Sequence, residues 1–349
     1  MRVATKYAHL FTLTDDTGIF QHSLYSIPDP SKGYTTDDNA RAAIAAAMLY
    51  QVYREEEYLF LLRRYLSFLI YAQNEEGFFR NFMNYNREFT EKKGSEDCFG
   101  RSLWALGYLL NVPFSDESYH NVAIRLLEKA LFNVKKLYSL RGKAYSLIGL
   151  SLIYNSEAFE FDRGEIRDLV KSLSQDLLKS YYKNREENWK WFEDQMTYSN
   201  AILPWSLLKA YTVTKDEEVL RGAKESMEFL GSVTFKDGYF KPIGCKGWYK
   251  KGGKRAEFDE QPIEACESAL MYIEAYRVFG EEEYLNKAKK CYRWFLGENS
   301  QNISLADEET GGCYDGITED GVNLNEGAES LISLIMTDMV VNHSSKVFK

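Results

Sequence analysis

The stretch GYTTDDNARAAIAAAMLY, residues 33 to 50, shows what kind of fold this chain adopts. From residue 37 to residue 53 the chain is alanine-rich and apolar on almost every side. A helix without a polar stripe has to be enclosed by other helices, because none of its faces suits water. Thr36 or Asp37 can cap the first turn of this helix. The neighbouring Asp38 is then not needed as a cap, so it needs another structural or functional explanation.

Helices of this enclosed type recur along the chain and alternate with amphipathic helices that carry a charged face. The enclosed helices are predicted at 37–53, 96–110, 141–154, 198–211, 261–276 and 325–340. The amphipathic helices are predicted at 55–73, 116–137, 163–182, 216–233 and 281–297, and residues 2–13 supply a sixth. No segment of useful length shows the two-residue period of a strand.

Six helix pairs in strict alternation indicate a closed ring and not an open row of repeats. An open solenoid needs a polar-faced cap at each end, whereas the first and last enclosed helices are as apolar as the central ones. We therefore expect an all-α fold, the (α/α)6 toroid, with six inner and six outer helices. The expected toroid occupies residues 1–349 as one domain.

Composition and charge argue against several kinds of partner and site. The formal net charge is −9, and an acidic chain is not expected to bind nucleic acid or an anionic membrane. Five cysteines without C-x-x-C spacing suggest free thiols in a reducing compartment. We see neither a secretory signal nor a membrane-spanning run, so the expected location is the cytoplasm. The four histidines lie outside the inner helices, so we expect no metal ion and no cofactor.

The predicted loops differ in length on the two sides of the ring. Connections from inner to outer helices are short, whereas the reverse connections at 15–36, 74–95, 234–260 and 298–322 are long. Loops of this length without regular structure usually carry function. The long loops emerge where the inner helices begin, and we expect the functional site at that face.

Carboxylate and amide side chains gather at the same helix starts. The candidates are Asp37, Asp38, Glu96, Asp97, Glu193, Asp194, Glu260, Gln261, Asp315, Asn325 and Glu326. Each of them could serve as a helix cap or ion-pair partner, and Asp37 has Arg41 one turn away. Converging carboxylates, however, repel one another and raise the pKa of one member. The result would be the protonated and ionised carboxyl groups that glycosidic cleavage requires.

Aromatic residues near these positions favour a sugar ligand. Trp191, Tyr198, Trp248 and Tyr314 could offer flat ring faces to a neutral sugar, whose hydroxyls would bind carboxylates and amides. We expect Asp38 to activate water or phosphate, and a carboxyl of the pair Glu96/Asp97 or Glu193/Asp194 to donate the proton. Trp191, Tyr198, Trp248 and Gln261 would hold sugar rings. His22 could reach the cavity from the first long loop, although a structural role is the alternative.

Five motifs in order carry a resemblance to a known family. They are LTDDTGIFQHSLYSIPDPSKGYTTDDNARA (13–42), GSEDCFGRSLWALGY (94–108), WFEDQMTYSNAILPWSLL (191–208), FDEQPIEA (258–265) and TGGCYDGITEDGVNLNEGAESLISLI (310–335). Together they resemble a poorly characterised bacterial and archaeal family of six-hairpin glycosidase-like proteins. Members of that family occur alone or C-terminal to a glycosyltransferase domain. The resemblance implies an oligosaccharide ligand and makes a glycosyltransferase a candidate partner.

The two ends of the chain are also similar to inverting cellulases of the six-hairpin class. Those enzymes place base aspartates before the first inner helix and an acid glutamate in an Asn-Glu motif at the last one. The corresponding places hold Asp37 and Asp38 at one end and Asn325–Glu326 at the other. Relatives often carry glutamine where this chain has Glu326. The resemblance thus shifts the acid role toward Glu96, Asp97, Asp194 and Asp315.

The sequence therefore predicts a carbohydrate-active protein, an inverting glycoside hydrolase or a phosphorylase of oligosaccharides. A non-catalytic glycan-binding or regulatory module that serves a glycosyltransferase is the alternative. A sugar isomerase that uses carboxylates and His22 is a weaker third reading. Sugar 2-epimerases share the toroid, but they rely on histidines in the cavity, which this chain largely lacks.

Overall fold

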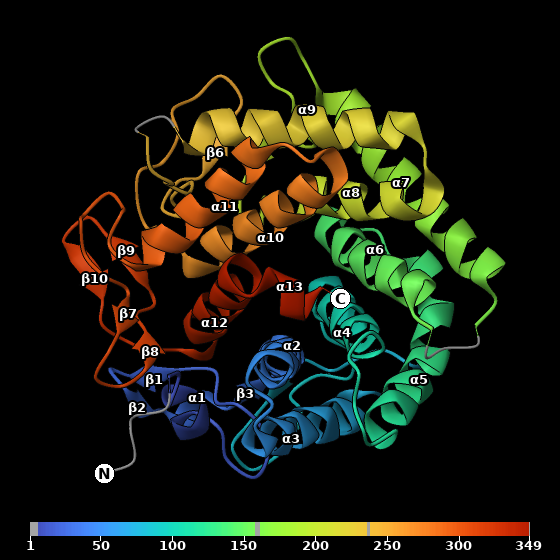
Figure 1. The fold of residues 1–349 in the computed structure, drawn as a ribbon, viewed down its shortest axis with the longest axis vertical. Coiled ribbons are helices and arrows are strands. Elements are labelled where there is room, and N and C mark those ends of the chain that lie inside the picture. Colours follow the sequence, from blue (N-terminus) through green and yellow to red (C-terminus); the bar gives the residue numbers. More distant parts are fainter. Residues whose placement is uncertain (1–5, 158–160, 236–237, 349) are drawn as a thin grey trace.

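The computed structural model describes residues 6–157, 161–235 and 238–348, and within them the chain forms a closed ring of helices (Figure 1). The inner helices are α2 (Thr36–Tyr53), α4 (Glu96–Leu109), α6 (Leu140–Asn155), α8 (Ile202–Thr214), α10 (Pro262–Phe279) and α12 (Ala328–Asn342). Each packs against the next, and α12 packs against α2, so that the ring closes. The prediction of an all-α (α/α)6 toroid is confirmed.

The outer layer consists of five long helices and one short one. The long ones are α3 (Glu56–Ala72), α5 (Ser118–Ala130), α7 (Arg163–Asn184), α9 (Glu217–Thr234) and α11 (Glu282–Phe295), and α5 continues as a 3-10 turn, Leu131–Lys136. The sixth outer helix was expected over residues 2–13, but α1 spans only His9–Thr12, and residues 2–5 lie outside the described part. The helix begins late because Tyr7 has a φ angle of +69°, which a right-handed helix does not allow.

The apolar inner helices are buried as their sequences require. In α2 the alanines from residue 42 to residue 47 are completely buried, along with Ile44 between them. The cap lies one residue earlier than predicted, because the Thr35 hydroxyl accepts the backbone N–H of Asp38 at 3.0 Å. Helices α4 and α6 lie closest together, since a Cβ on Gly107 would stand 2.6 Å from the carbonyl oxygen of Gly149. Only glycine permits this approach. Nearer the start of α4, a Cβ on Gly100 would likewise stand 2.7 Å from the carbonyl oxygen of Gly142.

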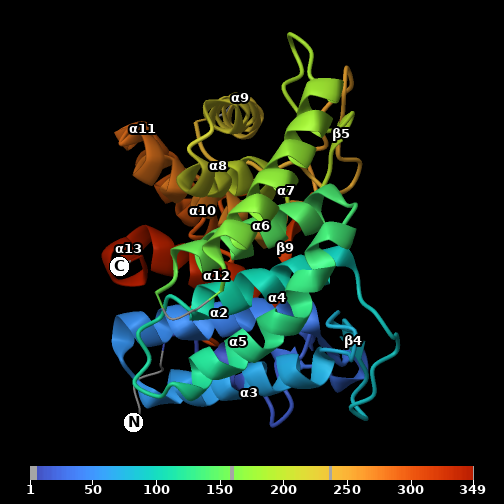
Figure 2. The same ribbon diagram turned by 90° about the vertical axis from the view of Figure 1, so that its right-hand side faces the viewer.

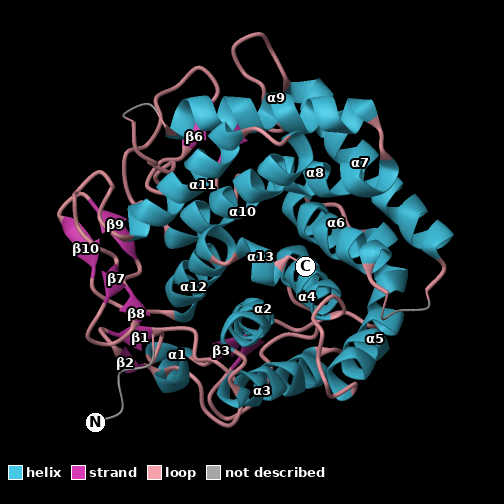
Figure 3. Cartoon of the chain, viewed as in Figure 1, coloured by secondary structure: helices cyan, strands magenta, loops and turns pink. Residues whose placement is uncertain are grey.

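Short β ribbons stiffen the long loops (Figure 3). They pair β1 (Ser23–Leu24) with β2 (Ile27–Pro28), β3 (Tyr34–Thr35) with β4 (Phe82–Met83), β5 (Gln195–Met196) with β6 (Tyr249–Lys250), β7 (Ala306–Asp307) with β8 (Gly312–Cys313), and β9 (Gly316–Thr318) with β10 (Gly321–Asn323). A side view places β4, β5 and β9 on one side of the ring, opposite to the C-terminal α13 (Ser344–Val347) (Figure 2). The side with the ribbons is where the inner helices begin.

Two further expectations concern thiols and membranes. All five cysteines belong to the described residues and are free thiols, as the sequence predicts. No helix in the described part of the chain is both long and apolar enough to cross a membrane.

Candidate active site at the mouth of the ring

Two adjoining cavities open at the face where the inner helices begin. The inner cavity has a volume of about 300 Å³ and the outer cavity about 720 Å³, which is the size range of small-molecule sites. Both cavities are lined by Asp37, Asn81, Phe82, Arg101, Gln261 and Glu329. Because these walls are shared, the two cavities form one site with a narrow inner part and a wider outer part.

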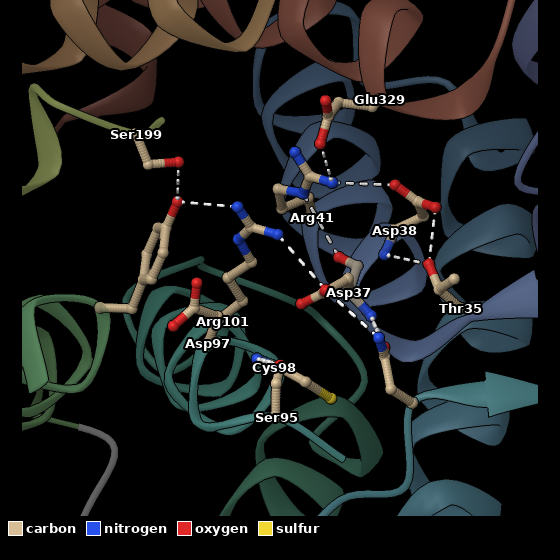
Figure 4. A network of polar contacts seen from close by, with 12 residues as sticks. Thr35, Asp37, Asp38, Arg41, Ser95, Asp97, Cys98, Arg101, Ser199 and Glu329 are labelled. Atoms are coloured by element: carbon tan, nitrogen blue, oxygen red, sulfur yellow. Dashed lines mark hydrogen bonds and ion pairs between the residues drawn. The ribbon is translucent and has the colours of Figure 1, made fainter. Parts of the chain in front are cut away.

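Asp38 is held in a buried ion pair with Arg41 (Figure 4). Its Oδ1 accepts from Arg41 Nη2 at 2.9 Å, and its Oδ2 accepts from the Thr35 hydroxyl at 2.6 Å. The same Nη2 donates to Glu329 at 3.0 Å, so Arg41 bridges the first and last inner helices. Burial raises the pKa of Asp38, against the opposing charge of Arg41.

The expected pairing of Asp37 with Arg41 is therefore wrong. Asp38 and Arg41 are three positions apart and share one face of α2, whereas Asp37 is turned toward α4. Asp37 Oδ2 lies 3.4 Å from Arg101 Nη1, and its backbone N–H donates to Asn81. Its Oδ1 has no hydrogen-bond partner within the described residues. Of the two adjacent aspartates, Asp37 has the carboxylate oxygen that is free to act on a ligand.

A buried network of hydrogen bonds holds Arg101 in place. Arg101 Nη2 donates to the Tyr145 hydroxyl at 2.9 Å, and that hydroxyl in turn donates to Glu267 on α10. Ser199 lies 2.9 Å from the same hydroxyl (Figure 4). Burial raises the pKa of Glu267, although the charge of Arg101 opposes it. Contacts from α2 to α10 thus fix the position of Arg101 beside Asp37.

Two carboxyl groups of the inner cavity have pKa values shifted in opposite directions. Asp315 accepts hydrogen bonds from the Gly327 N–H and the Ser330 hydroxyl, both at 2.8 Å, yet burial raises its pKa. Burial also acts to raise the pKa of Glu329, but Arg41 and Arg101 outweigh it and hold that pKa below its ordinary value. Opposite shifts in one cavity are typical of acid and base pairs in catalysis.

Several residues expected at the site do line the cavities. His22 and Asp315 line the inner cavity, Gln261 lines both, and Asp97, Tyr198 and Trp248 line the outer one. The Tyr198 hydroxyl donates to Asp97 at 2.7 Å. The described residues contain no group of three His, Cys, Asp or Glu side chains suited to a metal ion.

Glu96 lines the outer cavity, but its carboxylate is engaged in structural contacts. One of its oxygens accepts the backbone N–H groups of Tyr138 at 2.9 Å and Ser139 at 2.7 Å. The carboxylate thus fixes the chain that enters α6. A proton donor in this cavity would have to be another carboxyl group.

Other expected residues lie away from the cavity walls. Glu193 pairs with Arg141 at 2.9 Å, and Asp194 is exposed on the loop that leads to β5. Trp191 is completely buried in the core. Glu260 is also completely buried, and it accepts a hydrogen bond from the Trp294 indole at 2.8 Å. These four residues do not line the two cavities: Glu193 and Glu260 bind partners elsewhere, Trp191 is in the core, and Asp194 is exposed to solvent.

Three more of the expected site residues, in the loop before α12, also make structural contacts. Tyr314 donates to Asp307 at 3.1 Å, and Asn325 Oδ1 accepts the backbone N–H of Tyr25 at 2.9 Å. Glu326 is buried and accepts from the Thr310 hydroxyl at 2.7 Å. Its carboxylate also lies 3.8 Å from His9, on the outer side of the ring. These contacts tie the loop to α1 and the first hairpin.

Three site residues were not singled out from the sequence: Arg101, Asn81 and Tyr145. Arg101 and Tyr145 are polar side chains inside otherwise apolar inner helices, and this pattern could have identified them. Asn81 lies in a long loop without any such pattern. Its place beside Asp37 depends on the pairing of β3 with β4, which joins two loops far apart in the sequence.

Comparisons with known proteins show the fold. No protein-family model matches the chain, and no curated protein does. The cellobiose 2-epimerase of Spirochaeta thermophila is similar in structure, with 14% identity, a TM-score of 0.73 and coverage of 99% of this chain and 95% of its own. A D-mannose isomerase has 13% identity and a TM-score of 0.69, covering 97% and 96%. The family 76 α-mannanase of Bacteroides thetaiotaomicron has 14% identity and a TM-score of 0.66, covering 97% and 94%.

Proposed function

We propose that this chain is a carbohydrate-active enzyme that hydrolyses a glycosidic bond in a neutral oligosaccharide. The observation that carries the proposal is that Asp37, which has an unpartnered carboxylate oxygen, and Asp315, whose pKa is raised by burial, line one sugar-sized cavity. Glycosidic cleavage needs one protonated and one ionised carboxyl group. The similar structures include a mannanase, an epimerase and an isomerase that are named for their action on sugars, which supports a carbohydrate substrate.

The charge of the cavity favours water over phosphate as the attacking group. Asp37, Asp38, Asp97, Asp315 and Glu329 line its two parts, against the guanidinium groups of Arg41 and Arg101. Both guanidinium groups already pair with carboxylates. A phosphate or an acidic sugar would add negative charge to a site that is already negative, and repulsion would weaken its binding. Of the two reactions expected from the sequence, the site supports hydrolysis better than phosphorolysis.

In this proposal Asp37 takes the role of the base and Asp315 that of the acid. Asp37 lines the cavity, and its buried Oδ1 has no hydrogen-bond partner among the described residues, so this carboxylate can draw a proton from water as the water attacks the anomeric carbon. Asp315, with its raised pKa, donates a proton to the leaving oxygen. Trp248 and Tyr198 offer ring faces to sugar units in the outer cavity.

Asp38 takes a positioning role here, which differs from the base role expected from the sequence. Asp38 and Glu329 both lie within 3.0 Å of one arginine nitrogen, so their bonded oxygens are closer together than the roughly 6.5–9.5 Å of an inverting pair. These two carboxylates therefore leave no room for a water and a sugar between them. The base role that the sequence predicts for Asp38 stays a prediction, which substitution of Asp37 and Asp38 in turn can test.

The test is an oligosaccharide panel assayed with and without inorganic phosphate. We expect the parent protein to release shorter sugars without phosphate, and Asp37→Asn to lose about 10²- to 10⁴-fold in turnover while it still binds substrate. Asp194→Asn is the matched control, because Asp194 is exposed outside the cavity on the loop that leads to β5. Product formation that depends on phosphate, or equal turnover in Asp37→Asn and the control, would overturn the proposal.

A sugar isomerase or epimerase is the second candidate, because His22 lines the inner cavity beside Asp315. The similarity to a 2-epimerase and an isomerase also favours it. The same panel separates the two reactions, since isomerisation gives a product of unchanged mass. Binding without any product would instead support the glycan-binding module. A glycosyltransferase partner and a cytoplasmic location stay predictions.

A further inference from the structure

We propose that a groove beside the inner cavity binds additional sugar units of the same oligosaccharide, with Tyr25 as a stacking platform. This hairpin groove lies between the β1–β2 hairpin and the segment that precedes α12, and its volume is about 710 Å³. Its walls include Leu24, Tyr25, Ile27 and Asn325. The inference rests on the proposed function, because we take the occupant to be the oligosaccharide whose glycosidic bond is cleaved in the inner cavity.

The hairpin groove continues from the inner cavity. His22 lines both of them, so its side chain stands at the boundary. A sugar chain with one unit beside Asp315 and Glu329 can pass His22 and extend along the hairpin. The oligosaccharide can also extend from the inner cavity into the outer cavity, which Trp248 lines.

Tyr25 is presented to solvent in a backbone conformation that tyrosine rarely adopts. Its φ angle is +54°, in the left-handed region where glycine would be free of steric cost. Its ring is 60% exposed, so packing does not compensate for this conformation. Bulky residues in such conformations concentrate at ligand sites, where the surrounding structure holds them.

Three hydrogen bonds hold Tyr25 in this position. Its backbone N–H donates to Asn325 Oδ1 at 2.9 Å, and its carbonyl accepts from the Glu326 N–H at 3.0 Å. The Ser23 hydroxyl donates to the same carbonyl. The hairpin is thereby tied to the segment before α12, so the ring of Tyr25 has a fixed place relative to the cavity. Asn325, a candidate site residue in the sequence, thus holds the backbone of Tyr25 in place.

A second aromatic residue at the mouth shares this feature. Trp248, which lines the outer cavity, has a φ angle of +60°. Tyr25 and Trp248 thus lie in two hollows that each adjoin the inner cavity. Two such stacking surfaces suit an oligosaccharide that extends beyond the sugar unit in the inner cavity.

The chemistry of the hairpin groove suits a neutral polyhydroxylated chain. Leu24 and Ile27 are 63% and 67% exposed, and they give apolar contact surface. Asp29, Lys32 and Asn325 add polar groups along the same walls, and the charges of Asp29 and Lys32 offset each other. Sugars combine apolar ring faces with hydroxyl groups, so they can satisfy both kinds of wall.

The test compares Tyr25→Gly with the parent on neutral oligosaccharides of increasing length. Glycine removes the ring and also suits the positive φ angle, so the variant should fold at least as well as the parent. We expect KM for the longest oligosaccharides to rise about 2- to 10-fold, the value of one aromatic stacking contact, and KM for the disaccharide to stay unchanged. Tyr25→Phe should behave like the parent. Phe60→Ala, which removes a ring that is 52% exposed on α3, is the matched control.

Calorimetric titration of the same oligosaccharides separates this inference from the proposed function. If the parent has no turnover, the hydrolase proposal fails, but a length-dependent loss of affinity in Tyr25→Gly would still support the groove. Equal losses for short and long sugars, or no loss, would overturn the inference. A change in oligomeric state with unchanged sugar affinity would overturn it too, because the hairpin would then contact a second copy of the chain.

Discussion

The adjacent residues Asp37 and Asp38 should respond in opposite ways to the same substitution. The Asp38 side chain is only 5% exposed, and its two oxygens bind Arg41 and Thr35. Breaking a buried ion pair costs about 3–5 kcal/mol, because a charge is left without its partner. Arg41 keeps Glu329 as a second partner, so we expect Asp38→Ala to lower the free energy of unfolding by about 3 kcal/mol, the lower end of that range.

Asp37→Ala should cost less stability than Asp38→Ala and remove turnover. The Asp37 side chain is 17% exposed, and its contacts with Arg101 and Asn81 are both 3.4 Å long. Arg101 loses this ion pair but keeps its hydrogen bond to Tyr145, so we expect a loss of about 1–2 kcal/mol. Urea unfolding followed by tryptophan fluorescence measures stability, and oligosaccharide hydrolysis measures function. If Asp37→Ala is as destabilised as Asp38→Ala, or if Asp38→Ala is stable but inactive, the assigned roles are reversed.

Three further substitutions test other parts of the site. Tyr145→Phe removes the hydrogen bonds that Arg101 Nη2 and Glu267 make with the Tyr145 hydroxyl, so urea unfolding should show a loss of about 2–4 kcal/mol. The control Tyr108→Phe breaks one buried hydrogen bond and should lose about 1 kcal/mol; equal losses would contradict the network. Asp315→Asn should slow hydrolysis of natural glycosides about 10²- to 10⁴-fold but spare nitrophenyl glycosides, whose leaving group needs no proton; a parallel loss would exclude Asp315 as the acid. Burial, aided by the nearby charge of Glu267, raises the pKa of Glu264 to about 7, so the folded state binds its proton more tightly than the unfolded state. Its contribution to stability is therefore present at low pH and is lost as pH rises from about 4.5 to about 7, and Glu264→Gln should flatten this fall of at most about 3 kcal/mol in unfolding measured against pH.

The ring of helices could be predicted because its evidence is local. The apolar faces of α2 and the charged faces of α3 follow from residues a few positions apart, and their alternation requires two layers. The sixth outer helix was overestimated because the positive φ angle of Tyr7 prevents a helix from running through that residue, so only α1 forms after it.

The candidate site could be predicted only in part, because each carboxylate finds its partner through the tertiary structure. Both aspartates at the start of α2 are at the mouth, as expected. Spacings of three and four residues both allow a contact with Arg41, so the choice depends on partners from other helices, Arg101 for Asp37 and Glu329 for Arg41. Glu193 and Glu260 looked equivalent to the two aspartates in sequence. Their partners, Arg141 and Trp294, come from other helices and could not be read from the local pattern.

The most direct test of the central claim is a crystal structure of Asp37→Asn with a neutral oligosaccharide. The variant retains the shape of the cavity and should not turn the ligand over. We expect one sugar ring in the inner cavity between Asp315, Glu329 and residue 37, with the chain reaching toward Trp248. A sugar bound only outside these cavities, or an anion in the inner cavity in place of a sugar, would contradict the account.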